Sequence, residues 1–220
     1  MTGSHETRPA EYRYGAVFLL TLALLVFSVA APSADWARAV AVGLEFGALI
    51  VVVATSRARV DVRRARVGMV GVIAVAVVVA IGAGLLSKGV VFVISGLLAA
   101  LIPVALVRGL WRLVREHGVT LQAVAGALAI YLLIGLLFAW TVGFVATIES
   151  GPYFTNGHDA SGGAIVYFSF TVLTTTGFGD YVAATRAGHT LAVVEMLVGQ
   201  LYLVTVIGVL VGGLARRSAN

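Results

Sequence analysis

The chain of 220 residues contains no cysteine, so it can form neither a disulfide nor a thiolate metal site. Charged residues are also scarce, at 11%, whereas hydrophobic residues make up 60%. A globule with so apolar a surface would be insoluble in water, but a lipid bilayer accepts such a surface. The composition therefore predicts a membrane protein.

Arrangements of catalytic side chains are also missing from the sequence. His117 and His189 are isolated, no serine or aspartate lies in a nucleophile pattern, and metal-ligand spacing is absent. We therefore expect no enzymatic activity, no cofactor and no small-molecule substrate.

Long apolar runs fill most of the chain, and a run of about 20 residues is long enough to cross a bilayer. The run 163–174 is too short to cross, so it predicts a re-entrant pore helix. The expected fold is an all-α membrane protein with six transmembrane helices, this pore helix and a selectivity filter. The six spans are expected near residues 14–32, 36–55, 67–86, 89–108, 119–147 and 187–214.

The first apolar run has an alternative interpretation. Residues 14–34 could form a cleaved signal peptide, because Arg13 precedes the run and small residues follow at 30–34. The run is longer than a usual signal core, and cleavage would leave the orientation of the remaining spans unchanged.

Basic residues are spread unevenly over the predicted loops, and short loops rich in Lys and Arg stay on the cytoplasmic side. With both termini in the cytoplasm, only Arg38, Lys88 and Arg186 of the 15 basic residues fall outside. We expect a multi-pass protein of the plasma membrane whose arginines contact anionic lipid, with no nucleic-acid partner. The expected cytoplasmic set is Arg8, Arg13, Arg57, Arg59, Arg63, Arg64, Arg66, Arg108, Arg112, Arg115, Arg216 and Arg217.

The run Thr-Thr-Thr-Gly-Phe-Gly-Asp at 174–180 lies between the predicted pore helix and the last span. An ion that leaves water for a pore needs oxygen atoms in place of its hydration shell, and backbone carbonyls can supply them. Carbonyls that line one axis require left-handed backbone at intervals, which Gly177 and Gly179 adopt without steric cost. Thr175 adds a hydroxyl beside its own carbonyl. The run therefore predicts an ion filter over 175–179.

This run, the motif Tyr-Phe-Ser-Phe at 167–170 and the motif Gly-Gln-Leu-Tyr at 199–202 resemble bacterial potassium channels with a two-helix pore. The likeness covers about residues 119–215. Because one chain holds one filter copy and no obvious repeat, several chains must build the pore, and the resemblance implies a homotetramer. It also implies that permeant K⁺ binds Thr175, Thr176, Gly177 and Phe178, with Gly179 completing the filter.

Four segments follow from this interpretation. They are a tail at 1–12, a four-span domain with an amphipathic linker at 13–118, a pore domain at 119–215 and a short cytoplasmic tail at 216–220. Residues 89–107 contain no Lys or Arg, so we expect no steep voltage gating by charge movement, although the plan has six spans. Val107, Leu110, Trp111 and Val114 can share an apolar face, which predicts a linker along the inner leaflet.

The filter differs from the usual family pattern at three positions. Thr176 stands where potassium filters usually carry Val, Phe178 where they carry Tyr, and Thr171 where several relatives keep Glu. Phe178 lacks the phenol hydrogen bond, and the Thr176 hydroxyl needs a partner. We expect potassium preference with weaker discrimination or an easier collapse of the filter.

Other residues are expected to support the filter. Thr171 and Thr174 are expected to be among them, and Asp180 is expected both to anchor the filter strand and to attract cations at the outer mouth. Glu195, a carboxyl within the last span, is expected to brace the filter through a hydrogen bond to Ser169, Thr171 or Thr175, or else to bond without affecting conduction. Glu45 is expected to be a packing partner of another span.

The last span contains candidates for gating. Gly199 lies where related channels keep a hinge glycine, although close helix packing would also call for glycine. Gln200, Val204 and Ile207 are expected to face the cavity below the filter. Two other functions stay open: a weakly selective cation channel and, in a different class, a cation transporter subunit.

Overall fold

A computed structural model describes residues 14–55, 60–158 and 160–218. The predicted tail at 1–12, Arg13, Arg57, Arg59 and the last two residues lie outside the described residues. The described part is helical, and within it Phe154 and Ala183 form an isolated β-bridge. In chain order the elements are α1 (Tyr14–Ala30), α2 (Asp35–Thr55), α3 (Val60–Gly82), α4 (Lys88–His117), α5 (Leu121–Ile148), α6 (Gly162–Leu173), α7 (Arg186–Tyr202), the π-helix η1 (Leu203–Ile207) and α8 (Gly208–Ser218).

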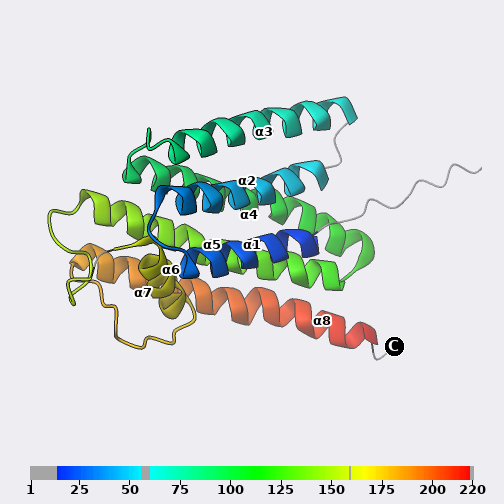
Figure 1. The fold of residues 1–220 in the computed structure, drawn as a ribbon. Helices are drawn as coiled ribbons and strands as arrows, with labels where there is room; N and C mark the ends of the chain where they lie inside the picture. Colours follow the sequence, from blue (N-terminus) through cyan, green and yellow to red (C-terminus); the bar gives the residue numbers. More distant parts are fainter. Residues whose placement is uncertain (1–13, 56–59, 159, 219–220) are drawn as a thin grey trace, which may run out of the picture.

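The long helices run roughly side by side, and α6 lies across them near one end of the bundle (Figure 1). We call this end, which also carries the loops 149–161 and 174–185, the filter end. The first described residue, Tyr14, and the end of α8 both lie at the opposite end. The two ends of the described chain are thus on one side, as the predicted orientation requires.

Four helices are long and apolar enough to cross a membrane: Asp35–Ala54, Lys88–Glu116, Leu121–Ile148 and Arg186–Gly213. Two further predicted spans appear as shorter apolar helices within the described residues, Tyr14–Ala30 and Arg66–Gly82. The all-helical membrane class is therefore supported. The crossing of α1 and α3, and hence the count of six spans, stays a prediction.

The predicted amphipathic linker is not a separate element, because α4 continues through Pro103 to His117. Part of the apolar face that was predicted to lie along the inner leaflet is exposed in the single chain, and its contact with lipid stays a prediction. Leu106 and Leu113 are buried, whereas Val107 and Trp111 are 52% and 66% exposed. Trp111 lies under the Arg115 guanidinium, 5.9 Å from the ring centroid.

Helix α5 forms the centre of the bundle, with contacts to α1, α4, α6 and α7. Within it, Trp140 donates an indole hydrogen bond of 2.7 Å to Oε1 of Glu45 on α2. Glu45 is fully buried. This bond confirms that Glu45 is a packing partner of another span, and it joins the N-terminal helices to the predicted pore domain.

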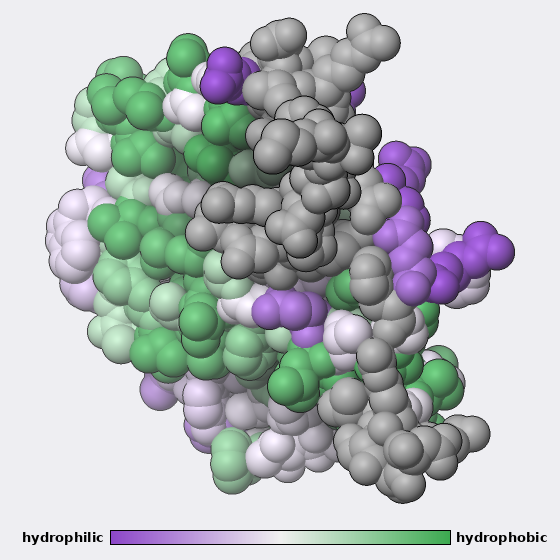
Figure 2. All heavy atoms as spheres, turned by 90° about the vertical axis from the view of Figure 1, so that its right-hand side faces the viewer, coloured by the Kyte–Doolittle hydropathy of each residue, from purple (hydrophilic) through white to green (hydrophobic). Residues whose placement is uncertain are grey.

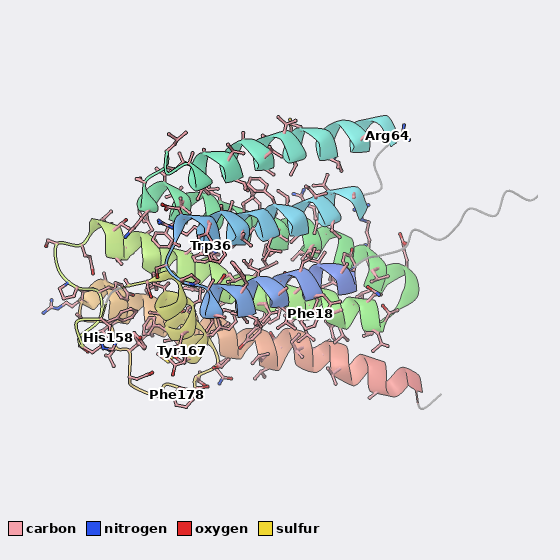
Figure 3. The ribbon with its side chains drawn as sticks, in the orientation of Figure 1. Phe18, Trp36, Arg64, His158, Tyr167 and Phe178 are labelled. Carbon is pink, nitrogen blue, oxygen red and sulfur yellow. The ribbon has the colours of Figure 1, made fainter. Side chains whose placement is uncertain are left out.

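The surface of the bundle changes from end to side. Figure 2 looks at the end opposite the filter end, where hydrophilic side chains stand among apolar ones, and apolar side chains dominate the flank beside it. Arg64 lies at this end, far from the loops of the filter end (Figure 3). Apolar flanks between polar ends are what a lipid bilayer requires.

Candidate functional site

The site begins with the short helix α6, which ends where the predicted filter starts. The Ser161 hydroxyl caps its N-terminus by accepting a hydrogen bond of 3.4 Å from the Ala164 amide. Ile165, Val166, Phe168 and Leu173 are buried against the bundle. At the C-terminus, the Thr174 hydroxyl donates to the Phe170 carbonyl at 2.6 Å. The predicted range 163–174 thus matches the observed helix within one residue.

After α6, alternate residues adopt left-handed backbone. Gly177 has φ +54°, Gly179 has φ +80°, and Thr175 has φ +57°. The two glycines were predicted to do so, whereas Thr175, a β-branched residue, was not. Its amide donates to the Val172 carbonyl at 2.9 Å, and the amides of Thr176 and Gly177 donate to the Thr171 carbonyl at 2.9 and 3.1 Å. The C-terminal turn of α6 therefore anchors the segment 174–180, which we call the strand, and offsets the strain at Thr175.

Hydroxyl groups form a short chain behind this strand. Oγ1 of Thr174 lies 2.8 Å from Oγ1 of Thr176. Since Thr174 gives its only proton to the Phe170 carbonyl, Thr176 must be the donor in this pair. The Gln200 amide on α7 donates to Oγ1 of Thr175 at 3.0 Å. Thr176 therefore has the partner that its hydroxyl needs, and Gln200 reaches the base of the strand.

Aromatic rings line the outer part of the strand. The rings of Tyr167 on α6 and Phe178 are stacked, with centroids 6.4 Å apart and planes 9° apart. The Asp180 carboxylate interacts with the Tyr167 hydroxyl. Figure 3 shows Tyr167 and Phe178 at the filter end, with His158 in the loop near them. Tyr167 was not predicted as a site residue, and its place in the motif 167–170 was the signal available.

The loop that precedes α6 holds the exit of the strand. The Asn156 side chain donates to the Asp180 carbonyl at 2.6 Å. Backbone bonds from Thr155 to Val182 at 2.9 Å and from Ala184 to Tyr153 at 2.8 Å fix the chain just beyond it. Sequence reasoning missed Asn156, because a contact 24 residues away leaves no local pattern. Asp180 is thus anchored through both its backbone and its carboxylate.

Glu195 on α7 lies behind α6, fully buried. Its Oε1 contacts the Ser169 hydroxyl, one of the three predicted partners. Ser169 also lies 2.8 Å from the Gly135 carbonyl of α5. One hydroxyl proton cannot serve both acceptors, so a Ser169 that donates to Gly135 needs a proton from the Glu195 carboxyl. The pair connects α5, α6 and α7 behind the strand.

Gly199 lies against the end of α6. A Cβ at this position would clash with the Leu173 carbonyl and lie 2.9 Å from Cδ1 of Leu173. Close packing therefore requires glycine here, and the hinge stays a prediction. One turn later the helix widens into η1, a π-helix over Leu203–Ile207 that contains Val204 and Ile207. Short π-helical turns often occur at functional sites.

The structure thus brings together Thr171, the strand and Gln200, with Glu195 behind α6. Val204 and Ile207 lie further along toward the opposite end, where Val204 is 71% exposed. The strand is itself exposed from Thr174 to Asp180, and Phe178 is 69% exposed. An extended strand with its rings and hydroxyls in the open is incomplete as a binding site within one chain.

Comparison with known proteins agrees with this geometry. Residues 126–215 match the model of a family described as "Ion channel". This stretch contains most of α5 and all of α6, the strand and α7. Neither the comparison with curated proteins nor that with solved structures found a match. The family match supports an ion channel that is embedded in a membrane.

Proposed function

We propose that this chain is a potassium-selective ion channel that conducts K⁺ passively through the central pore of a homotetramer. The observation that carries the proposal is the left-handed backbone at Thr175, Gly177 and Gly179. Alternation of this kind turns successive carbonyls toward one side, where four copies could surround a dehydrated cation. K⁺ would bind Thr175, Thr176, Gly177 and Phe178, in file along the strand.

Two other features support a cation pore. Helix α6 ends at the strand, so in the proposed pore the partial negative charge of its last carbonyls would lie beside the path of the ion. Asp180 follows the strand, and four copies would place a ring of carboxylates at the outer mouth. Neither feature selects K⁺ over Na⁺, so selectivity depends on the filter strand alone.

A second candidate function, a weakly selective cation channel, differs from the first in its ion selectivity. The Thr176 hydroxyl is tied to Thr174, and Phe178 has no phenol with which to bond its surroundings. We use the word cuff for the side-chain contacts that hold the filter from behind. A cuff made by Thr176 and Phe178, instead of the usual Val and Tyr, favours a weakly selective cation channel. The two candidates differ only in their permeability ratio.

Ion flux through the reconstituted protein tests the proposal. The purified full chain in liposomes should carry K⁺ flux that barium blocks and that exceeds Na⁺ flux under matched gradients. Equal K⁺ and Na⁺ flux would favour the weakly selective channel. Flux that saturates at low turnover and depends on a coupled ion would favour a transporter subunit. A strictly monomeric particle would contradict the pore itself.

A further inference from the structure

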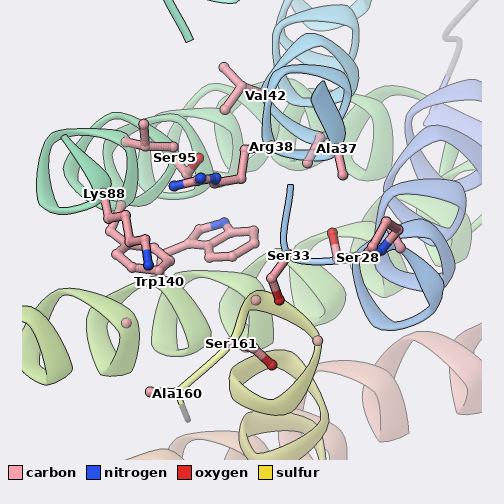
Figure 4. Close-up of a pocket in the computed structure, with 18 of the residues that line it drawn as sticks. Ser28, Ser33, Ala37, Arg38, Val42, Lys88, Ser95, Trp140, Ala160 and Ser161 are labelled. Atoms are coloured by element: carbon pink, nitrogen blue, oxygen red, sulfur yellow. The ribbon is translucent and has the colours of Figure 1, made fainter. Parts of the chain in front are cut away.

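A cavity of about 340 Å³ lies at the filter end, between the N-terminal helices and the pore region. Its wall is built from the end of α1, the starts of α2 and α4, the later part of α5 and the start of α6 (Figure 4). The volume falls within the range of ordinary small-ligand sites, roughly 300–1,000 Å³. None of the interactions argued above for ion conduction uses it.

Positive charge dominates this cavity. Arg38 and Lys88 line it, and Figure 4 shows both side chains extending toward Trp140. Among the described residues that line it there is no Asp or Glu: Asp35 pairs with Arg38, and Glu45 bonds Trp140. Three helices, α2, α4 and α6, begin at this wall and two, α1 and α5, end there, so on balance the helix ends add a smaller positive contribution.

The placement of both cations is unfavourable unless something compensates for it. Lys88 is the first residue of α4, and Arg38 lies in the first turn of α2. Cations destabilise a helix at this end, where the macrodipole is positive, by about 0.3–1 kcal/mol each. Asp35 compensates in part for Arg38. An anion in the cavity would compensate for both cations.

Polar atoms in the wall also lack partners. Oγ of Ser28 and Nε of Arg38 are buried and have no hydrogen-bond partner among the described residues. Ser28 is only 8% exposed and lines the cavity. Buried polar groups nearly always find a partner, in the protein, in water or in a ligand. Both atoms can donate a hydrogen bond, so an acceptor of negative charge would satisfy both.

We propose that this cavity binds the phosphate of an anionic phospholipid, with Arg38 and Lys88 as the charged contacts and Ser28 as a further donor. The apolar part of the wall, which includes Phe27, Phe92 and Trp140, suits the glycerol and the first acyl carbons. Trp36, 56% exposed and packed edge-on against Phe27, is a residue typical of the membrane interface. A zwitterionic headgroup fits less well, since its own cation would face Arg38 and Lys88.

Lipid binding to the purified full chain in neutral detergent tests this proposal. Phosphatidylglycerol is titrated in native mass spectrometry, with phosphatidylcholine and inorganic phosphate as comparison probes. Lys88→Gln should weaken phosphatidylglycerol binding about fivefold, and Arg38→Gln with Lys88→Gln about thirtyfold, at about 1 kcal/mol per cation. Lys88→Arg should bind like the wild type. Lys88 is exposed, so its substitution leaves the packing intact even where Arg38→Gln unfolds the chain.

Arg186→Gln is the matched control, because Arg186 is an exposed cation at the filter end that does not line the cavity. Wild-type affinity in this control supports the proposal. Equal affinity in the wild type and in Lys88→Gln would overturn it, and so would an equal loss in Arg186→Gln. Displacement of the lipid by millimolar inorganic phosphate would identify a free anion as the ligand and contradict the lipid. Since the assay reads binding and not ion flux, its failure would leave the proposed channel untouched.

Discussion

The helix α5 and the rod formed by α7, η1 and α8 contribute candidate spans of equal length and similar apolar character, yet the chain buries them very differently. Each provides a candidate span of 28 residues, Leu121–Ile148 and Arg186–Gly213. The most apolar part of the first is 56% buried within the chain, and that of the second only 17%. Hydropathy alone cannot separate them, because lipid and protein are both acceptable surroundings for an apolar side chain.

The difference in burial indicates what covers each of these two parts of the chain. Gln200, on the less buried rod, donates a hydrogen bond to Thr175 of the strand, and the strand itself is exposed. Lipid could cover the apolar side chains of α7, but it cannot satisfy an open strand of carbonyls and hydroxyls. Further copies of the chain are therefore the expected cover on this side, whereas α5 is already enclosed by its own chain.

The largest expected effect is at the exposed strand. Gly177→Ala would force a Cβ into left-handed backbone at φ +54°, at about 1–2 kcal/mol per copy. The carbonyls would turn away from the shared axis, so K⁺ flux in liposomes should fall at least tenfold while the particle keeps its size. Gly71→Ala on α3 is the control, since a Cβ there meets nothing within 4 Å and should leave flux unchanged. Normal flux in Gly177→Ala would contradict a carbonyl filter.

The next largest effect, on assembly, is expected from the exposed side of α7. Leu197 and Leu201 are 58% and 62% exposed in the single chain. If copies cover them, changing both to Ala should weaken assembly by about 1–2 kcal/mol per leucine, the packing part of a buried Leu→Ala loss. Native mass spectrometry would then show a larger share of monomers.

A paired substitution on another exposed helix shows whether that loss is specific. Val72 and Val75 on α3 are 72% and 65% exposed, and we expect lipid to cover them. Changing both to Ala should leave the oligomer intact. Loss of assembly in this control, or none in the leucine pair, would mean that α7 is not the interface.

An effect of similar size per chain is expected where α5, α6 and α7 meet behind the strand. Glu195→Ala would leave the buried Ser169 hydroxyl with the Gly135 carbonyl alone and would open a cavity, at about 2–4 kcal/mol of unfolding free energy. Glu195→Gln keeps a donor toward Ser169 and should cost less than half as much. Thermal unfolding and K⁺ flux of the two variants check this order. Equal behaviour of both variants and the wild type would remove the brace.

Gly199→Ala separates a packing role of Gly199 from a hinge role, at the contact between α7 and the end of α6. The added methyl would press on the Leu173 carbonyl, so packing predicts a loss of about 1–3 kcal/mol in thermal unfolding. A pure hinge predicts altered open probability in single-channel records with unchanged stability. Gly212→Ala on α8, where nothing lies within 4 Å of the added Cβ, is the control.

The parts that sequence reasoning predicted are those with local causes. Helix α6 and the left-handed glycines follow from an apolar run and from the conformational freedom of glycine. Sequence reasoning gave three candidate partners for Glu195 and named none for Glu45, because the partners, on α6 and α5, come from distant parts of the chain. Asn156 and the left-handed Thr175 could not be foreseen, since both depend on how the loop 149–161 and the end of α6 hold the strand. The apolar face predicted for the end of α4 is partly exposed in the single chain, so its contact with lipid stays a prediction.

The smallest expected effect is on selectivity, and it tests how well each chain holds its exposed strand. Thr176→Val with Phe178→Tyr removes the hydroxyl pair with Thr174 and adds a phenol that can bond to its surroundings. A firmer cuff should raise the K⁺ over Na⁺ permeability ratio severalfold, or about 1 kcal/mol, read from reversal potentials. Thr174→Val is the matched control, because it breaks the same hydroxyl pair without adding a phenol and should leave the ratio equal or lower. A ratio that does not rise in the double variant would mean that the cuff of each chain does not set selectivity, and the contacts between copies would then have to set it.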